Sequence, residues 1–540
     1  MNLNKLKIIF KLLSTTVILF STTYGCAQRY EGRYDNVDVS LNKYRKLLHI
    51  ISTCYIDTVN QQQIIDNAII GTLKTLDPHS YYISKEEYKA MSEPLEGNFE
   101  GIGIEFNILK DTLIVVSPLS GGPSEKVGLK SGDRIISVDG KSITNINLTI
   151  IKVHSLLRGP KGSTIRVTVK RGTSVMDFDI VRDRIPINSL DAAYEIKPGM
   201  AYLKLSRFAK NSMDEIEEAF AKFENPKSLI LDLRGNGGGF MNIASALADQ
   251  FFGEGKLLVY TESRAFPVQK EISTSYGNFK TGNLTVLIDE ASASASEIVS
   301  GAIQDQDRGI IIGRRSFGKG LVQSEFPMGD GSAIRLTIAR YLTPSGRAIQ
   351  SPYEKGKAEQ YYKNLSNRMS AEAFSADSIV FPDSLKYNTL VNKRVVYGGG
   401  GIMPDIYVPL DTSMYSKYIG ELNRKNIIFQ FISTYIDKNR KSLQGKYKTF
   451  TTFKQSFTVT DNLFDEMVAY GEKEGLPADK EGIKISGNYI KQYMKALIAR
   501  HLFDYSAYFR IMNEGDRTYE KAIEVLDNWD RYRKECLKEE

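Results

Sequence analysis

Cysteine and histidine are scarce in this 540-residue sequence. The three cysteines are Cys26, Cys54 and Cys536, and Cys26 lies in a leader segment at the N-terminus. The other two cannot build a disulfide scaffold, although a single bridge between them stays open. Stability must therefore come from hydrophobic cores, for which a hydrophobic content of 42% is sufficient.

The four histidines limit the catalytic chemistry. They are His49, His79, His154 and His501, and none lies in the α/β part of the chain described below. A Ser-His-Asp triad within that part is excluded, and one that borrows a distant histidine is disfavoured. The sequence also lacks a His-Glu-x-x-His motif, a cysteine cluster and a phosphate-binding loop, so no metal and no nucleotide cofactor is expected.

Neither positive nor negative side chains are strongly in excess. The formal net charge of the whole chain is +7, and it is smaller without the leader segment, which contains lysines. This excess is too small to indicate a nucleic-acid partner.

The N-terminus lacks an uninterrupted apolar run of membrane-spanning length. Residues 1–27 place lysines before a short apolar stretch and small residues after it, which is typical of an export signal. Lys11 breaks the stretch, which falls short of the roughly 20 apolar residues that a spanning helix needs. We therefore expect an exported protein, either periplasmic or lipid-anchored in the cell envelope.

Two modes of signal cleavage stay open. Cys26 after Gly25 is similar to a lipoprotein box, which would attach the chain to a membrane through a lipid. However, Thr23 stands three residues before Cys26, where an aliphatic residue is usual. An ordinary signal peptidase site would instead be cleaved before Gln28. Cys26 is thus a lipidation candidate.

The chain after the leader falls into four parts. Residues 36–95 have helical periodicity, residues 97–184 form short strands separated by glycines, residues 185–410 alternate strands and helices, and residues 411–540 are helical again. Within the third part, residues 351–394 are polar and irregular, which indicates an insertion. The two helical parts carry no catalytic signature. We assign the N-terminal part a packing or oligomerisation role. For the C-terminal part a plain structural role, a helical cap, a substrate-handling arm and a homodimer surface all stay open.

The second part has the order of elements of a PDZ domain. Four β-type runs follow one another in it, namely GIGIEF, TLIVVSPL, DRIISVDG and TIRVTVKR. In a PDZ domain the first run supplies a carboxylate-binding turn and an edge strand to which a peptide adds. The substrate-binding candidates are therefore Gly101, Ile102, Gly103 and Ile104.

A lysine in the third part fits a catalytic base. A serine hydroxyl can be activated by a lysine that burial keeps neutral, which requires the lysine pKa to fall from about 10.4 to near 7 or 8. Lys319 lies between Gly318 and Gly320 among apolar residues. On a strand it would share a face with Gln323, whose uncharged amide can hold the amine without favouring its protonation.

Five motifs of the third part together resemble the carboxyl-terminal processing proteases, which are Ser/Lys peptidases related to tail-specific protease. The motifs are LDLRGNGGG, SASASEI, FGKGLVQ, YLTPSGRAIQ and PDI. The resemblance implies a multidomain α+β fold, with an α/β protease core of the crotonase and Clp-protease type, a PDZ domain, and helical N- and C-terminal regions. It covers over two thirds of the chain and ends near residue 408.

The resemblance also implies catalytic roles. Ser294 would be the nucleophile, Lys319 the general base and Gln323 the residue that orients the lysine. The neighbouring serines, Ser292 and Ser296, are expected to cap or pack.

Backbone amides complete the implied site. Those of Ala295 and Gly239, with Gly238 as neighbour, would bind the oxyanion at the start of a helix. Glu297 is expected to be a first-turn carboxylate favoured by the helix dipole. Arg158 occupies the PDZ position that in relatives would latch the PDZ domain to the protease core, with a solvated surface role as the alternative.

The sequence therefore predicts an exported serine endopeptidase that binds the C-terminal tails of protein substrates through its PDZ domain and needs no cofactor. One alternative is a tail-binding scaffold that retains the protease fold without catalysis. Another is a crotonase-like acyl-CoA enzyme, which rests on fold analogy alone and is opposed by the PDZ-like part.

Overall fold

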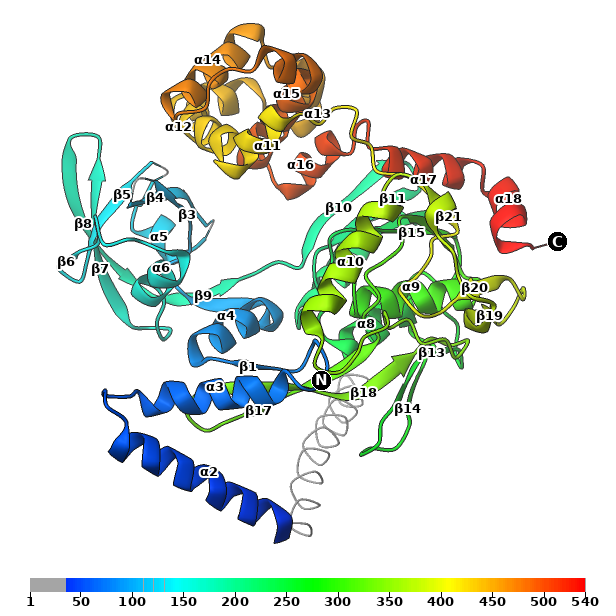
Figure 1. Ribbon diagram of the computed structural model, residues 1–540. Coiled ribbons are helices and arrows are strands. Elements are labelled where there is room, and N and C mark those ends of the chain that lie inside the picture. Colours follow the sequence, from blue (N-terminus) through cyan, green and yellow to red (C-terminus); the bar gives the residue numbers. More distant parts are fainter. Residues whose placement is uncertain (1–34, 110, 120, 131, 540) are drawn as a thin grey trace, which may run out of the picture.

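The computed structural model describes residues 35–539 except residues 110, 120 and 131, so the leader segment with Cys26 lies outside the described residues. Figure 1 shows an α/β core to which three parts are attached, namely an N-terminal helical arm, a PDZ domain and a C-terminal helical bundle. No helix in the described ranges is long and apolar enough to cross a membrane.

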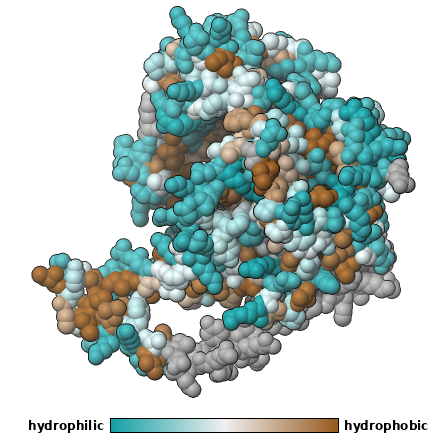
Figure 2. Space-filling view, turned by 45° about the vertical axis from the view of Figure 1, so that its right-hand side comes forward, coloured by the Kyte–Doolittle hydropathy of each residue, from teal (hydrophilic) through white to brown (hydrophobic). Residues whose placement is uncertain are grey.

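The N-terminal arm joins the core through one short strand. Its elements are α2 (Asp35–Cys54), α3 (Gln61–Leu73), β1 (Tyr81–Ile83) and α4 (Lys85–Glu96). Ser84 and Glu87 form a capping box that begins α4. β1 pairs antiparallel with β18 (Ala333–Leu342) of the core. In contrast, α2 projects from the molecule with apolar side chains in solvent (Figures 1 and 2), which include Val39, Leu41, Leu47 and Ile50.

The PDZ domain is a small sheet with a helix packed over one edge. Its elements are β3 (Ile104–Leu109), β4 (Thr112–Pro118), α5 (Pro123–Lys126), β5 (Arg134–Val138), β6 (Lys141–Ser142), α6 (Ile150–Leu157), β7 (Thr164–Arg171) and β8 (Ser174–Val181). The sheet order is β3-β4-β5-β7-β8, with β6 paired to β5, so β3 is an edge strand. The paired strands β2 (Asn98–Gly101) and β9 (Asp183–Pro186) connect the domain to the rest of the chain.

The core is built on a six-stranded sheet of order β10-β11-β12-β15-β16-β21, in which only β10 is antiparallel to its neighbour. The strands are β10 (Leu190–Lys197), β11 (Met200–Leu205), β12 (Ser228–Asp232), β15 (Asn283–Ile288), β16 (Ile310–Gly313) and β21 (Ile406–Tyr407). One face is covered by α7 (Ser212–Phe220), α8 (Met241–Asp249) and α9 (Ala295–Asp305). All residues of β12 are buried, as expected for a parallel strand covered on both faces.

A second sheet lies beside the first. It has the order β1-β18-β13-β14, with β17 (Leu321–Pro327) paired to β18. The other strands are β13 (Leu257–Glu262) and β14 (Gln269–Ile272). Through β1, this sheet combines strands of the arm and the core.

The segment 351–394, which the sequence predicts to be irregular, is ordered. It contains α10 (Ala358–Glu372), 3-10 turns at Ala376–Ser378 and Asp383–Leu385, and the hairpin of β19 (Lys386–Asn388) and β20 (Val395–Tyr397). Tyr361 and Leu365 of α10 are buried, and Arg368 donates to the carbonyl oxygen of Ser316 at 2.8 Å. The prediction of irregular structure is wrong because long-range packing holds this polar helix on the core.

The C-terminal region divides in two. Helices α11 (Lys417–Arg424), α12 (Ile427–Lys446), α13 (Phe450–Ser456), α14 (Asp461–Lys473), α15 (Lys480–Leu502) and α16 (Tyr505–Met512) share one buried cluster and form the bundle. By contrast, α17 (Arg517–Asp527), α18 (Trp529–Tyr532) and a π-helical turn at Arg533–Leu537 cover the core sheet on the face opposite α8 and α9. Cys54 and Cys536 are both free, so no bridge joins them here.

The packing of α17 on the core sheet can be tested with Leu526→Ala. Leu526 is 5% exposed in the cluster between α17 and the sheet, and its truncation should destabilise this unit by about 3 kcal/mol. Trp529, the only tryptophan of the chain, packs against the same cluster, so its fluorescence during urea denaturation reports on this interface. The control Ile272→Ala on the exposed strand β14 should leave the midpoint unchanged. Equal midpoints for both variants would contradict the packing.

Candidate active site

Ser294 occupies a strained turn between β15 and α9. Its φ of 54° and ψ of −111° lie outside the regions that non-glycine residues favour. Such strain persists only where the surrounding structure holds it, and it is concentrated at functional sites. Ser294 is half-buried, whereas Ser292 and Ser296 are fully buried. Their hydroxyls donate to the carbonyl oxygens of Leu233 and Asn236, each at 2.8 Å, so these two serines hold the turn.

The Glu297 carboxylate links the serine turn to the lysine loop. It accepts hydrogen bonds from the amides of Ser294 (2.8 Å), Gly318 (2.7 Å) and Lys319 (2.9 Å) and from the hydroxyl of Ser316 (2.6 Å). Glu297 is fully buried, and burial raises the pKa of its carboxyl although these hydrogen bonds oppose the shift. Its role therefore extends well beyond the predicted interaction with the helix dipole.

The hydroxyl of Tyr341 makes a second link between the same two segments. Tyr341 lies on β18 and is buried. Its hydroxyl can donate to the carbonyl oxygen of Lys319 at 2.7 Å and to that of Ser294 at 3.1 Å. Two buried side chains thus hold the backbone of both candidate catalytic residues.

The glycine loop after β12 lies directly against the serine turn. The carbonyl oxygen of Asn236 accepts from the amide of Ala293 (3.0 Å) and from the hydroxyl of Ser296 (2.8 Å). A Cβ atom at Gly238 would lie 2.9 Å from the Cβ atom of Ser294. Only glycine therefore allows this approach of the loop to the candidate nucleophile.

Of the three backbone amides predicted to lie at the oxyanion site, not all are free to donate a hydrogen bond to a ligand. Ala295 is the first residue of α9, so its amide has no partner within the helix. The amide of Gly239 makes no hydrogen bond to any described residue. The amide of Gly238, however, donates to Asn236 Oδ1 at 2.9 Å. Ala295 and Gly239 can therefore supply an oxyanion hole, whereas Gly238 serves the close approach of the loop.

Lys319 lies in a loop before β17, so the prediction that it sits on a strand is wrong. Gly318, with φ of 89°, turns the chain there, and a side chain at that position would meet Ser351. Burial, followed by the charge of Arg335, lowers the pKa of the Lys319 amine to about 8, although the charges of Glu297 and Asp77 oppose the shift. The shift has the direction and size that a lysine base requires.

Gln323 lies on β17, after an irregularity in the pairing of β17 with β18. Its side-chain nitrogen is buried and has no hydrogen-bond partner among the described residues. A buried, unsatisfied amide is costly unless it serves a ligand or a changing partner. Gln323 is therefore still a candidate for orienting Lys319.

The N-terminal arm contributes a loop to the surroundings of Lys319. The Asp77 carboxylate accepts from the hydroxyl of Thr337 at 2.9 Å, and the Ser80 hydroxyl accepts from the amide of Thr337 at 3.0 Å. Thr337 is the β18 partner of Gln323. The loop Asp77–Ser80 therefore lies over the strand pair that carries Gln323.

His79 of this loop lies near the candidate site, although the sequence predicts no histidine there. Burial, followed by the charge of Lys319, lowers the pKa of its ring to about 4, so the ring is neutral at neutral pH. Its Nε2 is buried without a partner among the described residues, and the ring packs edge-to-face on Tyr361 at 5.4 Å. Tertiary structure brings this residue from the arm to the core.

The side chains of Ser294 and Lys319 are not hydrogen-bonded to each other in this arrangement. Within the described part of the chain, no hydrogen bond joins Ser294 Oγ to Lys319 Nζ. Such contacts are often loose without substrate and tighten on binding. The described residues also contain no group of three or more His, Cys, Asp or Glu side chains that could hold a metal ion.

The predicted peptide-binding turn leads into β3 of the PDZ domain. Its carbonyl groups are engaged, because Ile102 accepts from the Ser124 hydroxyl at 2.6 Å and Gly103 from the Leu119 amide at 3.0 Å. The amides of Ile102 and Gly103 have no partner among the described residues. Gly101 and Ile104, which flank them, are buried. A fixed turn with unpaired amides is suited to a terminal carboxylate.

Arg158 contacts the arm, and among the described residues its side chain makes no hydrogen bond or ion pair with the protease core. Its guanidinium pairs with Glu93 of α4 and lies over the ring of Phe99 at 4.9 Å from the centroid. Its Cγ is 3.6 Å from the position that a Cβ atom at Gly101 would occupy. The structure therefore places Arg158 between α4 and the predicted peptide-binding turn.

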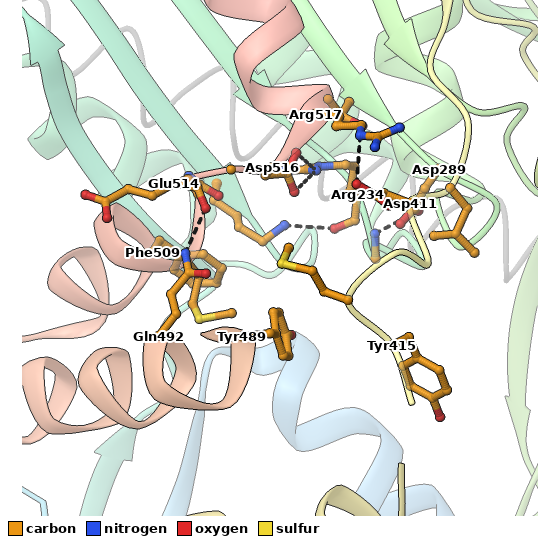
Figure 3. Close-up of a pocket in the computed structure, with 18 of the residues that line it drawn as sticks. Arg234, Asp289, Asp411, Tyr415, Tyr489, Gln492, Phe509, Glu514, Asp516 and Arg517 are labelled. Atoms are coloured by element: carbon orange, nitrogen blue, oxygen red, sulfur yellow. Dashed lines mark hydrogen bonds and ion pairs between the residues drawn. The ribbon is translucent and has the colours of Figure 1, made fainter. Parts of the chain in front are cut away.

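A cavity of about 580 Å³ lies between the glycine loop and the C-terminal helices (Figure 3). Arg234 on its wall pairs with Asp232 at 2.7 Å and with Asp516 at 2.8 Å. Asp516 precedes α17, so this network ties the C-terminal segment to the start of the glycine loop. Neither Ser294 nor Lys319 lines the cavity, which is therefore separate from the candidate active site.

Four family models match separate stretches of the chain. The model of peptidase family S41 matches residues 199–355, the PDZ domain matches residues 114–171, and the N-terminal domain of the activating protease CtpB matches residues 22–87. A family of unknown function matches residues 418–504, which lie in the bundle.

Curated relatives decide the family. The carboxy-terminal-processing protease of Bartonella bacilliformis is 36% identical over 329 residues, which cover 58% of this chain and 74% of that protein. The chain belongs to the carboxy-terminal processing proteases. The carboxy-terminal processing protease CtpB of Bacillus subtilis is 34% identical, over 58% of this chain and 66% of the relative.

Solved structures of related proteases overlap with parts of the chain. The photosystem II D1 C-terminal processing protease is 28% identical, with a TM-score of 0.31, over 56% of this chain and 82% of that one. The PDZ domain of a carboxy-terminal protease from Vibrio cholerae, in complex with a peptide, is 32% identical, with a TM-score of 0.16, over 17% and 99%. These scores are too low to carry an argument about the arrangement of the parts.

Several residues of this carboxy-terminal processing protease have structural roles that sequence reasoning missed. Glu297 and Tyr341 link the segments of the two candidate catalytic residues, and Asp77, His79 and Arg335 surround Lys319. Asp77 and His79 lie in the run LDPHS. Only the concentration of polar residues in that run could have identified it.

The pKa of Lys319 can be measured directly. With ¹³C-labelled lysine, the NMR signal that Lys319→Met removes should titrate near 8, whereas exposed lysines titrate near 10.4. Asp77→Asn should lower the value further, because the Asp77 carboxylate favours the protonated amine. Lys270→Met on the exposed strand β14 is the control and should leave the Lys319 signal in place. Titration of Lys319 together with the exposed lysines would contradict its burial.

Proposed function

We propose that this carboxy-terminal processing protease hydrolyses protein substrates with Ser294 as nucleophile and Lys319 as general base. The observation that carries the proposal is the joint support of the two residues by Glu297 and Tyr341. The lowered pKa of Lys319, about 8, supports it further, because a usable fraction of the amine is neutral at neutral pH.

The chemistry follows from these positions. Ser294 Oγ attacks the scissile carbonyl carbon while Lys319 Nζ takes its proton, and the amides of Ala295 and Gly239 bind the developing oxyanion. Loss of one such donor raises the barrier by about 3 kcal/mol. Lys319 then gives the proton to the leaving amine, and the acyl-enzyme is hydrolysed by water with Lys319 again as base.

Substrate recognition is assigned to the PDZ domain. A C-terminal carboxylate would bind the amides of Ile102 and Gly103, and the preceding residues would pair with the edge strand β3. The buried apolar side chains Val153 and Leu157 of α6 lie in the same cluster as Ile104, which supports an apolar tail as ligand.

Export and assembly complete the proposal. Residues 1–27 support an exported protein, periplasmic or anchored through a lipid on Cys26, on the sequence alone. The apolar side chains that α2 exposes, such as Val39 and Leu41, support a homodimer formed through the arm.

Alanine variants test the Ser/Lys assignment. Ser294→Ala and Lys319→Ala should each reduce cleavage of a purified unfolded protein with an apolar tail by at least about 1,000-fold, because either change removes the nucleophilic step. The rate is measured by gel densitometry or by release of a fluorophore. Full activity of either variant would overturn the assignment.

The matched controls are Ser275→Ala and Lys270→Ala, both at exposed positions and both expected to retain full activity. The alternative function is a tail-binding scaffold that keeps the protease fold without catalysis. Tail binding by the wild-type protein without any turnover would support the scaffold and exclude the protease.

A further inference from the structure

The C-terminal bundle approaches the PDZ domain at its peptide-binding edge. Arg500 of α15 forms an ion pair with Glu105 of β3, and the Arg500 side chain is only 16% exposed. A second approach lies at Gly132, where a Cβ atom would be 3.0 Å from the carboxylate of Asp437 on α12. Two helices of the bundle therefore lie against the PDZ sheet.

Glu105 lies on the face of β3 that points away from α6. The ring of Phe106 packs edge-to-face against His154 of α6 at 5.8 Å between centroids, so Phe106 faces the peptide groove. Successive side chains of a strand point to opposite faces. The pairing of β3 with β4 is irregular between Glu105 and Phe106, but the extra residue lies on β4, so β3 keeps this alternation. Glu105 therefore points to the other side, where it meets Arg500.

Tyr505 extends this surface of the bundle. The guanidinium of Arg500 lies over its ring, 4.2 Å from the centroid, and Tyr505 is 47% exposed. Burial raises the pKa of its hydroxyl; the charge of Arg500 opposes this shift, and the nearby charges of Glu105 and Asp191 add to it. Since Asp191 belongs to β10, Tyr505 lies where the PDZ domain, the core and the bundle meet, and Figure 1 shows α16 between β3 and β10.

A peptide that adds to β3 presents two sets of side chains. Residues opposite each other in an antiparallel pair point to the same face. The peptide residues opposite Ile104 and Phe106 therefore point toward α6, and the residue opposite Glu105 points toward the bundle. In a tail whose carboxylate binds at Gly101–Gly103, the penultimate residue belongs to the second set.

We propose that Arg500 and Tyr505 form a second wall of the peptide groove and select a substrate tail with an aromatic or large apolar penultimate side chain. Glu105 neutralises the Arg500 charge, so the surface offered to the peptide is the Tyr505 ring and the flat guanidinium, which suit stacking. This inference rests on the proposed tail recognition and assigns a role to the bundle.

The test measures peptide binding to the full chain carrying Ser294→Ala, which removes turnover. Two fluorescein-labelled peptides of about ten residues share an apolar C-terminal residue and differ only in a penultimate Phe or Gly. Fluorescence anisotropy should give a Kd about fivefold lower for the Phe peptide, a size typical of one aromatic contact. Adding Tyr505→Ala should remove this preference without weakening the Gly peptide.

Tyr505→Phe, which keeps the ring, should retain the preference, and Tyr276→Ala, at an 80% exposed site between β14 and β15, should leave both affinities unchanged. An undiminished preference in Tyr505→Ala, or no preference in the parent, would overturn the second wall while tail recognition stands. Failure of the parent to bind either peptide would overturn tail recognition itself, and the inference with it.

Discussion

The four hydrogen bonds to the Glu297 carboxylate are the interaction on which the candidate site depends. One buried group accepts from the amides of both Ser294 and Lys319, so neither segment can move without leaving a buried donor or acceptor unpaired. In a medium of low dielectric this penalty is large. The same network explains how the fold holds Ser294 at a positive φ, a conformation that would not persist in an isolated turn.

The candidate lysine base, Lys319, depends on parts of the chain outside the core. Its lowered pKa comes mainly from burial, and the loop Asp77–Ser80 of the arm lies on the adjoining strands. Pairing of β1 with β18 therefore helps to hold this loop at the candidate site. At the other side, Asp516 ties the C-terminal segment to Arg234 at the start of the glycine loop. The arm and the C-terminal segment are thus structural components of the candidate site.

Prediction from sequence succeeded where the reason was local and failed where it was not. The glycine loop, the turn at Ser294 and the edge strand of the PDZ domain follow from short motifs, because tight turns and close backbone approach require glycine. Lys319 lies in a loop because its flanking glycines allow a turn that the apolar pattern does not reveal. The helix α10 was not predicted, because it has few buried residues, such as Tyr361 and Leu365, and most of its other residues are polar.

The sequence by itself determined the order of the parts and the identity of the candidate nucleophile and base, because motif residues and their spacing are properties of the chain. The tertiary structure decided which groups surround them. It brought His79 to Lys319, engaged the Gly238 amide with Asn236, and set Arg500 of the bundle against Glu105 of the PDZ domain. Most of these contacts join residues far apart in the chain, and periodicity and local propensity carry no information about such pairs.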